Sequence, residues 1–229
     1  MRHLHRDLER LKRRILSMGS LVEAAIDTAL TALVERRPGL AEEVITGDDR
    51  IDDREVEIED ECLKMLALHQ PVARDLRFIV TTLKVNNDLE RMGDLARNVA
   101  ERAAFLSSRP SLDSPPLLTE IAERVRRMIR EALDALVGQD TALARGVIRS
   151  DDEVDRMHRR MYAVVEDWVR AEPDRIERAL HILSASRHLE RMADLATNIA
   201  EDVVFLVEGV VIRHGRDRAP QPPAPPPPA

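Results

Sequence analysis

The chain has few aromatic residues, few glycines and a single cysteine, and each shortage excludes something. Aromatic residues make up 2% of the 229 positions and the formal net charge is −7, whereas nucleic-acid-binding domains usually present a basic surface studded with aromatic side chains. We therefore expect no nucleic-acid partner. The lone cysteine, Cys62, excludes a disulfide within the chain and fits a reducing compartment. Glycine occurs only 8 times while alanine, leucine, arginine and glutamate are abundant, which is typical of an all-α protein.

Long apolar runs are missing as well. The N-terminal segment, MRHLHRDLERLKRR, contains no apolar core of the kind that a secretory signal has. No uninterrupted apolar run approaches the roughly 20 residues that span a bilayer. These two absences predict a cytoplasmic protein that meets a membrane only indirectly, through partners.

Apolar residues recur at steps of three and four over most of the chain, which predicts long amphipathic helices. Proline and glycine interrupt this pattern at Pro38-Gly39, at Pro71, at Gly138 and at Pro173, and residues 107–116 (SSRPSLDSPP) have the composition of a linker. The expected helices run over about residues 4–36, 40–68, 72–106, 117–137, 141–170 and 174–211.

The expected helices fall into two halves that are related by a repeat. Residues 88–105 (DLERMGDLARNVAERAAF) and 188–205 (HLERMADLATNIAEDVVF) are identical at eleven of eighteen positions, and residues 44–52 align with 147–155. Because short connections favour antiparallel neighbours, we predict an all-α fold of two tandem, sequence-related three-helix bundles with six long helices. The expected division is 1–107 for the first bundle, 108–116 for a linker, 117–214 for the second bundle and 215–229 for a disordered proline-rich tail.

Acidic residues line one face of the second and third expected helix in each half. Their four pairs, each with a spacing of four residues, are Asp48/Asp52, Glu90/Asp94, Asp151/Asp155 and Glu190/Asp194. Like charges at this spacing share a helix face and destabilise the helix by about 0.2–0.5 kcal/mol per pair. Because the pairs recur in both halves despite this cost, we interpret them as functional residues. Carboxylates on facing helices supply hard oxygen ligands that can bridge metal ions. The alternative interpretation is a solvated polar face.

Two hexapeptides resemble the repeated hallmark of the PhoU family. They are LERMGD at residues 89–94 and LERMAD at residues 189–194. Residues 69–77, where His-Gln-Pro is followed by Asp-Leu-Arg, are similar to the segment that enters the family's third helix, and residues 207–214 are similar to its C-terminal end. The likeness covers roughly residues 5–214.

The resemblance implies a non-enzymatic adaptor in phosphate signalling. Such a protein links a phosphate ABC transporter, through its ATPase subunit, to a sensor histidine kinase, and it holds the phosphate-starvation response and phosphate uptake in check. The resemblance also implies multinuclear iron or zinc clusters on the four acid pairs. Two departures stand out, since Ala193 replaces the family's glycine and His158 replaces the acid found at Glu55. Exposed faces on long bundles additionally favour a homodimer.

Two other functions stay open at this point. A di-iron carboxylate enzyme of ferritin-like type would use Glu-x-x-His on two helices of one bundle, and this motif is absent from the sequence. A purely structural helical scaffold would carry acids that only solvate its surface. We find no nucleophile–base arrangement and no glycine-rich phosphate loop, so no catalytic residue is predicted.

Overall fold

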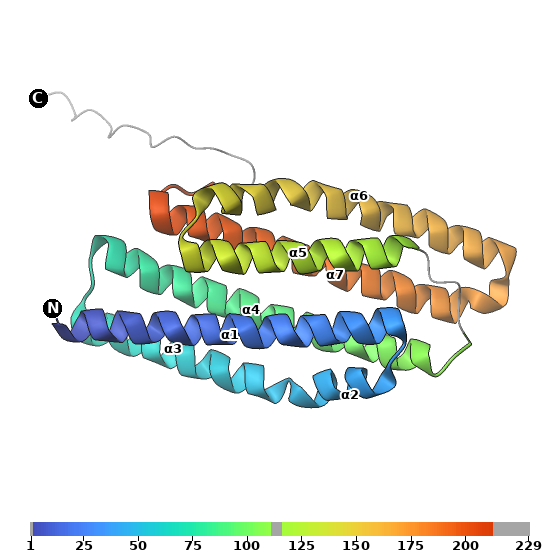
Figure 1. Cartoon of the computed structure of the whole chain (residues 1–229), viewed down its shortest axis with the longest axis horizontal. Coiled ribbons are helices and arrows are strands. Elements are labelled where there is room, and N and C mark those ends of the chain that lie inside the picture. Colours follow the sequence, from blue (N-terminus) through green and yellow to red (C-terminus); the bar gives the residue numbers. More distant parts are fainter. Residues whose placement is uncertain (1, 111–115, 213–229) are drawn as a thin grey trace, which may run out of the picture.

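The computed structural model describes residues 2–110 and 116–212, and within these ranges it contains helices and no strands (Figure 1). The helices are α1 (Arg2–Glu35), α2 (Pro38–Gly47), α3 (Asp49–His69), α4 (Ala73–Ser107), α5 (Pro116–Gly138), α6 (Thr141–Ala171), the 3-10 turn η1 (Pro173–Arg175) and α7 (Ile176–Glu208). The all-α prediction is confirmed. The predicted tail at residues 215–229 lies outside the described residues, and the predicted domain bounds stay a prediction.

The second expected helix, at residues 40–68, is divided into two segments. α2 ends at Gly47 and α3 begins two residues later, while Asp48 between them keeps a helical backbone (φ −60°, ψ −44°). The Ile51 N–H donates to the Asp48 carbonyl oxygen at 2.8 Å, a three-residue step that tightens the backbone. The equivalent helix α6 has Ser150 in place of the poor helix former Gly47, and it runs unbroken for 31 residues. The prediction of one continuous helix was therefore wrong at this point.

Local residues account for several helix ends. The Asp140 carboxylate accepts hydrogen bonds from the backbone N–H groups of Ala142 (2.9 Å) and Leu143 (3.0 Å), which satisfies two donors that the start of α6 leaves free. Gln70, which precedes a proline, ends α3 in the left-handed region (φ 44°). Gly209 ends α7 in the same region (φ 74°), which glycine reaches without a steric penalty.

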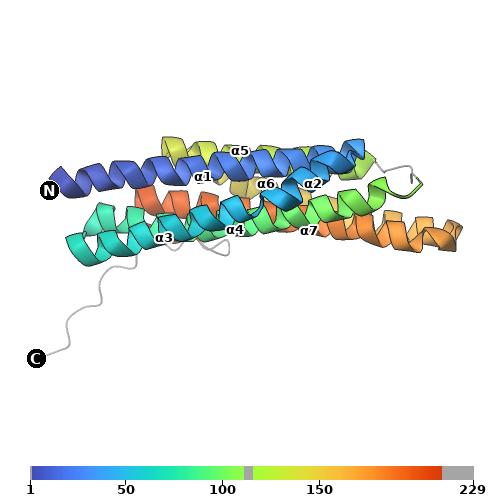
Figure 2. The same cartoon turned by 90° about the horizontal axis from the view of Figure 1, so that it is seen from below.

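Each half of the chain packs as a three-helix bundle, and the two bundles lie side by side along their length (Figures 1 and 2). α1, α2/α3 and α4 form the first bundle, and α5, α6 and α7 form the second. α4 and α7 make the main contact between them. Phe105 near the end of α4 stacks on His181 near the start of α7 (ring centroids 3.6 Å apart), whereas Lys84 early in α4 donates to Asp202 late in α7 at 2.9 Å. The two central helices therefore run antiparallel.

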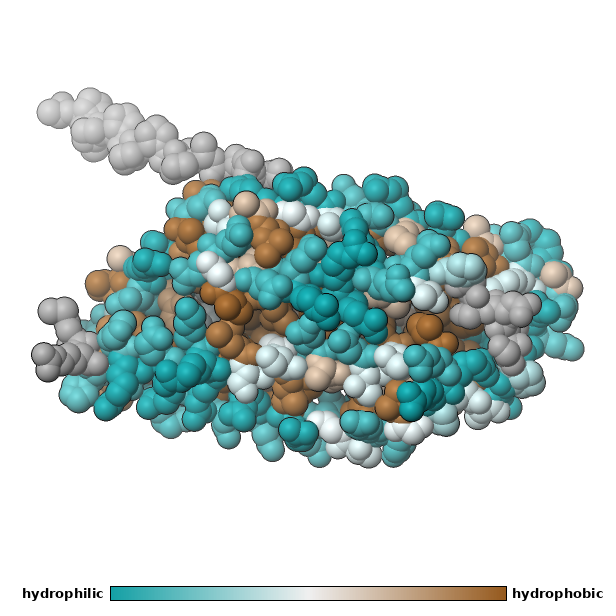
Figure 3. Space-filling model, in the orientation of Figure 1, coloured by the Kyte–Doolittle hydropathy of each residue, from teal (hydrophilic) through white to brown (hydrophobic). Residues whose placement is uncertain are grey.

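One continuous hydrophobic core runs through both bundles. Equivalent residues of the repeat occupy equivalent places in it: Leu89 and Met92 on α4, and Leu189 and Met192 on α7, are all fully buried. The side of the molecule drawn in Figure 3 is mainly hydrophilic, with smaller hydrophobic areas between the charged side chains. The repeat thus preserves the spacing that fills the core.

α1 is long and apolar enough over residues 3–35 to cross a bilayer, judged by length and composition alone. Its apolar side is buried in the core, where Leu11 and Met18 are fully inaccessible. On its polar side Asp27 accepts a hydrogen bond from Arg126 of α5 at 2.6 Å. A core helix meets the same criterion, so α1 gives no independent sign of a membrane span.

Candidate cation-binding clusters

Two clusters of carboxylates form where α3 faces α4 and where α6 faces α7. The first acidic cluster consists of Asp48, Asp52, Glu55, Glu90 and Asp94, and the second acidic cluster consists of Asp151, Asp155, Glu190 and Asp194. In both clusters, charges on the facing helix contribute to the pKa of the members. The structure thus brings the four predicted acid pairs together two by two, one set in each bundle.

The first acidic cluster includes a positively charged side chain, the guanidinium of Arg97. Asp48 is 6% exposed, and burial is the main reason why its pKa lies above its ordinary value, with Asp52 and Asp94 adding to the rise. Arg97 opposes this rise because its Nη1 donates to Oδ2 of Asp48 at 3.3 Å. The same guanidinium lies 3.8 Å from Glu101, measured from Nε to Oε1.

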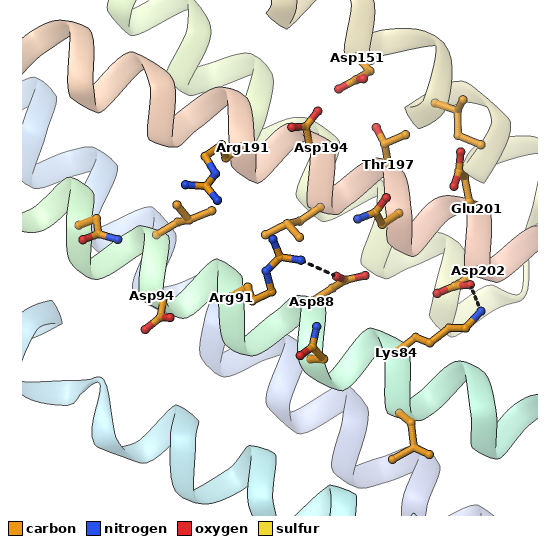
Figure 4. Close-up of a pocket in the computed structure, with 17 residues that line it drawn as sticks. Lys84, Asp88, Arg91, Asp94, Asp151, Arg191, Asp194, Thr197, Glu201 and Asp202 are labelled. Carbon is orange, nitrogen blue, oxygen red and sulfur yellow. Dashed lines mark hydrogen bonds and ion pairs between the residues drawn. The ribbon is translucent and has the colours of Figure 1, made fainter. Parts of the chain in front are cut away.

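The second acidic cluster is centred on Asp151, whose pKa is raised to about 6, first by burial and then by neighbouring aspartates, Asp194 foremost. Thr197 stands where the first half has Arg97. The Thr197 hydroxyl near the Asp151 carboxylate offsets a part of this rise in pKa. Oδ1 of Asp151 is buried and has no hydrogen-bond partner among the described residues. Figure 4 shows the carboxylates of Asp151 and Asp194 on the facing helices α6 and α7.

Beside each cluster a polar side chain of the third helix contacts one of the second helix, and both members of this pair differ between the halves. In the first half, Nδ2 of Asn86 donates to the Glu55 carbonyl oxygen at 2.9 Å and lies 3.3 Å from the Glu55 Oε1. The equivalent residues of the second half are Ser186 and His158, and Oγ of the serine lies 2.9 Å from Nδ1 of the histidine. Burial lowers the pKa of His158, which favours the neutral imidazole.

Gly93 allows α3 to approach α4 closely beside the first acidic cluster. A Cβ added to Gly93 would lie 2.9 Å from Cδ1 and 3.1 Å from Cγ2 of Ile51, which is closer than side-chain atoms normally pack. The equivalent residue on α7 is Ala193, which is buried and carries the Cβ that position 93 excludes. The helix pairs that hold the two clusters are therefore packed differently.

A groove of about 1020 Å³ runs between α4 and α7 and reaches both acidic clusters, at Asp94 of the first and at Asp151 and Asp194 of the second (Figure 4). Arg91 and Arg191 both line it, one from each bundle. Within the groove Lys84 pairs with Asp202 at 2.9 Å, and Nη1 of Arg91 lies 3.9 Å from Oδ1 of Asp88. Sequence reasoning missed the Lys84–Asp202 pair because its members lie 118 residues apart and helix periodicity says nothing about such partners.

The carboxylates of the two acidic clusters are the donors that the predicted iron or zinc would need. Within the part of the chain that the structure describes, no three His, Cys, Asp or Glu side chains are arranged as a set that could hold a metal ion as they stand. The metal role of the eight acids therefore stays a prediction. The second acidic cluster offers carboxylate oxygens, and the buried Oδ1 of Asp151 has no hydrogen-bond partner among the described residues. In the first acidic cluster, the guanidinium of Arg97 donates to Asp48.

Comparison with known proteins identifies two repeats in the chain. The family model for the PhoU domain matches the chain twice, at residues 15–103 and 118–203. The chain belongs to the PhoU family. Both copies of the PhoU domain include a third helix with its hexapeptide, so the resemblance inferred from those residues is confirmed.

Similar proteins align over nearly the whole chain. A phosphate-specific transport system accessory protein PhoU homolog from Aquifex aeolicus is 43% identical over 211 residues, covering 92% of this chain and 96% of that protein. The Pseudomonas aeruginosa homolog of the same name is 40% identical, covering 91% and 86%. A crystal structure of PhoU from P. aeruginosa superimposes with a TM-score of 0.86 at 39% identity, covering 90% and 99%. That of the phosphate transport system regulatory protein PhoU from Streptococcus pneumoniae has a TM-score of 0.80 at 28% identity, covering 91% and 98%.

Proposed function

We propose that this chain is an accessory protein of a phosphate transport system that connects the transporter's ATPase subunit to a sensor histidine kinase. When phosphate is plentiful, it holds the starvation response off and restrains phosphate uptake. The observation that carries this proposal is the doubled PhoU domain, together with relatives that are named for that transport system and align over nearly their full length.

A binding role is supported by the groove between α4 and α7, where cationic side chains such as Lys84 and Arg91 lie beside carboxylates such as Asp194, as on surfaces that recognise a charged partner. A ferritin-like di-iron enzyme would draw its ligands from four helices of one bundle, whereas the acids of this chain form two separate clusters, each between two helices. These observations favour an adaptor that acts through its surfaces.

The metal part of the proposal is that the acidic clusters hold iron or zinc. The ligands would be Asp48, Asp52, Glu90 and Asp94 in the first half and Asp151, Asp155, Glu190 and Asp194 in the second half. A bound metal would supply positive charge that neutralises several carboxylates at once. These residues orient the oxygen ligands from two helices, so occupancy would tie α3 to α4 and α6 to α7 and adjust the surface that partners meet.

The signalling role is tested by deleting the gene and complementing it from a plasmid. We expect a phosphate-starvation reporter to become active in phosphate-rich medium in the deletion strain and to be silenced again by the wild-type gene. The empty plasmid is the control for complementation. Normal repression in the clean deletion strain would contradict the signalling role.

The partners are tested by affinity capture of the full chain from cells grown in high and in low phosphate, followed by mass spectrometry. We expect the transporter ATPase subunit and a histidine kinase in the capture, with an amount that depends on phosphate. Cell fractionation and light scattering of the purified protein test the proposed cytoplasmic location and the proposed homodimer. Recovery of neither partner under either condition would count against the adaptor.

A further inference from the structure

A crevice of about 140 Å³ opens in the first bundle, where the break between α2 and α3 faces α1. Its walls are mainly apolar, with Leu21 and Ala25 on α1 and Val44 and Ile51 on either side of the break. Gly47, the last residue of α2, also lines the crevice, and a Cβ added there would meet no atom outside its own helix within 4 Å. An engineered apolar cavity of about 150 Å³ in another protein binds benzene, so a space of this order accommodates one side chain.

In the second bundle, longer side chains of the chain itself occupy the equivalent positions. The alignment of the two halves pairs Ala25 with Met128 and Leu21 with Arg124. Met128 is 1% exposed, so its long side chain is buried at the position where Ala25 leaves space. Arg124 reaches from α5 over α6, where its Nη2 lies 3.4 Å from Oγ of Ser150.

The difference between the halves indicates what fits the crevice. Ala25 is shorter than Met128 by an unbranched thioether chain, whereas the wall residue Val44 and its counterpart Val147 are identical and buried. The missing volume thus corresponds to an aliphatic side chain of about the size of methionine. Because protein interiors are close-packed, apolar atoms that border an open space gain contacts when such a group enters it.

Charged residues border the crevice on the solvent side. Glu43 and Arg50 line it and are exposed, and neither forms an ion pair within residues 2–110 and 116–212. Interfaces between proteins commonly combine an apolar anchor in a central pocket with charged groups around it that select the partner. The mouth of the crevice therefore complements a segment that carries charges of both signs beside its anchor.

We propose that this crevice is a docking pocket for a partner protein, which inserts one methionine-sized aliphatic side chain where the second bundle uses its own Met128. The inference rests on the proposed adaptor function and adds the place and the chemistry of one contact. Glu43 and Arg50 at the rim orient the partner segment through groups of opposite charge. Because Met128 and Arg124 occupy the equivalent positions in the second bundle, the two halves present different surfaces to partners.

The pocket is tested by titrating the full-length protein with ethyl methyl sulfide, the analogue of a methionine side chain, and following methyl signals by NMR. We expect a saturable shift of the Ile51 methyl signals in the wild type. Ala25→Met copies the second half and fills the crevice, so it should weaken binding of the probe by about tenfold or more. Leu63→Met is the control, because it adds a methionine at an exposed position outside the crevice and should leave the shift unchanged. No saturable shift in the wild type, or the same shift in Ala25→Met, would overturn the inference.

The reverse substitution tests whether the repeat identifies the ligand. Met128→Ala should open the equivalent space in the second bundle. The probe should then raise the urea midpoint of this variant by more than that of the wild type, because a ligand that binds only the folded chain stabilises it. Met128→Leu keeps the volume and should respond as the wild type does. An equal rise in Met128→Ala and the wild type would overturn the assignment, and the Ala25→Met titration decides the matter alone if Met128→Ala does not fold.

Docking of a partner is tested by affinity capture with the wild type, Ala25→Met and Leu63→Met, followed by quantitative mass spectrometry of the transporter ATPase subunit and the histidine kinase. We expect Ala25→Met to recover at least one of them about tenfold less well than the wild type, since filling the pocket excludes the anchor. Equal recovery by all three proteins would overturn the docking role and leave the adaptor function standing. Recovery of neither partner by the wild type would overturn both, whereas the probe titration would still show whether the crevice binds an aliphatic group.

Discussion

In the first bundle Arg97 donates to a buried aspartate, Asp48. In the second bundle the neutral Thr197 takes the place of Arg97, and Oδ1 of the equivalent Asp151 has no hydrogen-bond partner within residues 2–110 and 116–212. A second exchange accompanies this one, since Glu55 of the first half is replaced by His158. Core residues such as Leu89 and Met92, by contrast, keep the same identity in the second half, at Leu189 and Met192. The same helical architecture thus holds two polar clusters of different charge. This is possible because the apolar residues that fill the core and the polar residues of the clusters lie on different faces of the same helices.

Leu89 and Leu189 test whether the two bundles unfold as one unit. Both are fully buried at equivalent positions of α4 and α7. We expect Leu89→Ala and Leu189→Ala each to lower the free energy of unfolding by about 2–5 kcal/mol, because each leaves a cavity in the core. Since the core is continuous across the bundles, thermal melts followed by circular dichroism should show a single transition at a lower Tm for both variants.

The control for this prediction is Leu63→Ala, because Leu63 is 54% exposed and its removal should change the free energy by less than about 0.5 kcal/mol. Two resolved transitions, only one of which moves in each leucine variant, would show that the bundles unfold independently. That result would contradict the expectation of one cooperative unit, because the two bundles would then be separate folding units.

Ionisation of the Asp151 carboxyl group should lower the free energy of unfolding more than ionisation of the Asp48 carboxyl group does. The pKa of Asp151 is raised from its ordinary value of 3.8 to about 6 by burial and by neighbouring aspartates. The folded protein therefore holds this proton more tightly than the unfolded chain. Stability from this group is present below about pH 4 and is lost as the pH rises through about 6, by up to about 3 kcal/mol.

We accordingly expect Asp151→Asn to stabilise the metal-free protein at pH 7.5 and to have little effect at pH 4. Urea unfolding at both pH values, with a chelator present, measures this difference. Asp48→Asn is the matched variant. Because Arg97 opposes the rise in the pKa of Asp48, Asp48→Asn should raise the free energy of unfolding at pH 7.5 by less than Asp151→Asn does. Equal gains from the two variants would contradict the asymmetry.

Gly93 and Ala193 report how closely the second helix of each bundle approaches the third. Gly93→Ala should destabilise the protein by about 1–3 kcal/mol, because the new methyl group would meet the buried Ile51 side chain at 2.9 Å. Helix propensity alone predicts the opposite sign, a gain of about 0.5–1 kcal/mol. Urea unfolding decides between them, and Ile51→Val, which removes Cδ1, should rescue the variant. Ala193→Gly should cost only about 1 kcal/mol.

Helix periodicity and the internal repeat were enough to predict the two bundles and the acid row on each helix, because both depend on spacing along a helix. The division of the second helix at Asp48 escaped prediction, since one glycine inside a helical pattern is a weak signal. The alignment of the two copies shows Arg97 opposite Thr197, but nothing in the sequence says that Arg97 reaches Asp48 on another helix. Contacts such as Lys84 with Asp202 depend on the packing of one bundle against the other.

The smallest expected difference lies at the starts of α2 and α6. Asp140 caps α6 through two backbone N–H groups, whereas the equivalent Arg37 at the start of α2 makes no side-chain cap. Asp140→Ala should therefore lower the free energy of unfolding by about 1 kcal/mol, and Arg37→Asp should raise it by about 0.5–1 kcal/mol. The extended backbone at Arg37 (φ −102°, ψ 96°) suits a capping residue.

Arg37→Ala separates the new cap from the loss of the arginine, whose ion pair with Glu35 at 3.6 Å is exposed and should contribute little. Urea unfolding of the three variants beside the wild type measures the order of stability. If Arg37→Asp is no more stable than Arg37→Ala, the cap is absent. The start of α2 would then be held by the proline in its first turn, a feature that α6 does not have.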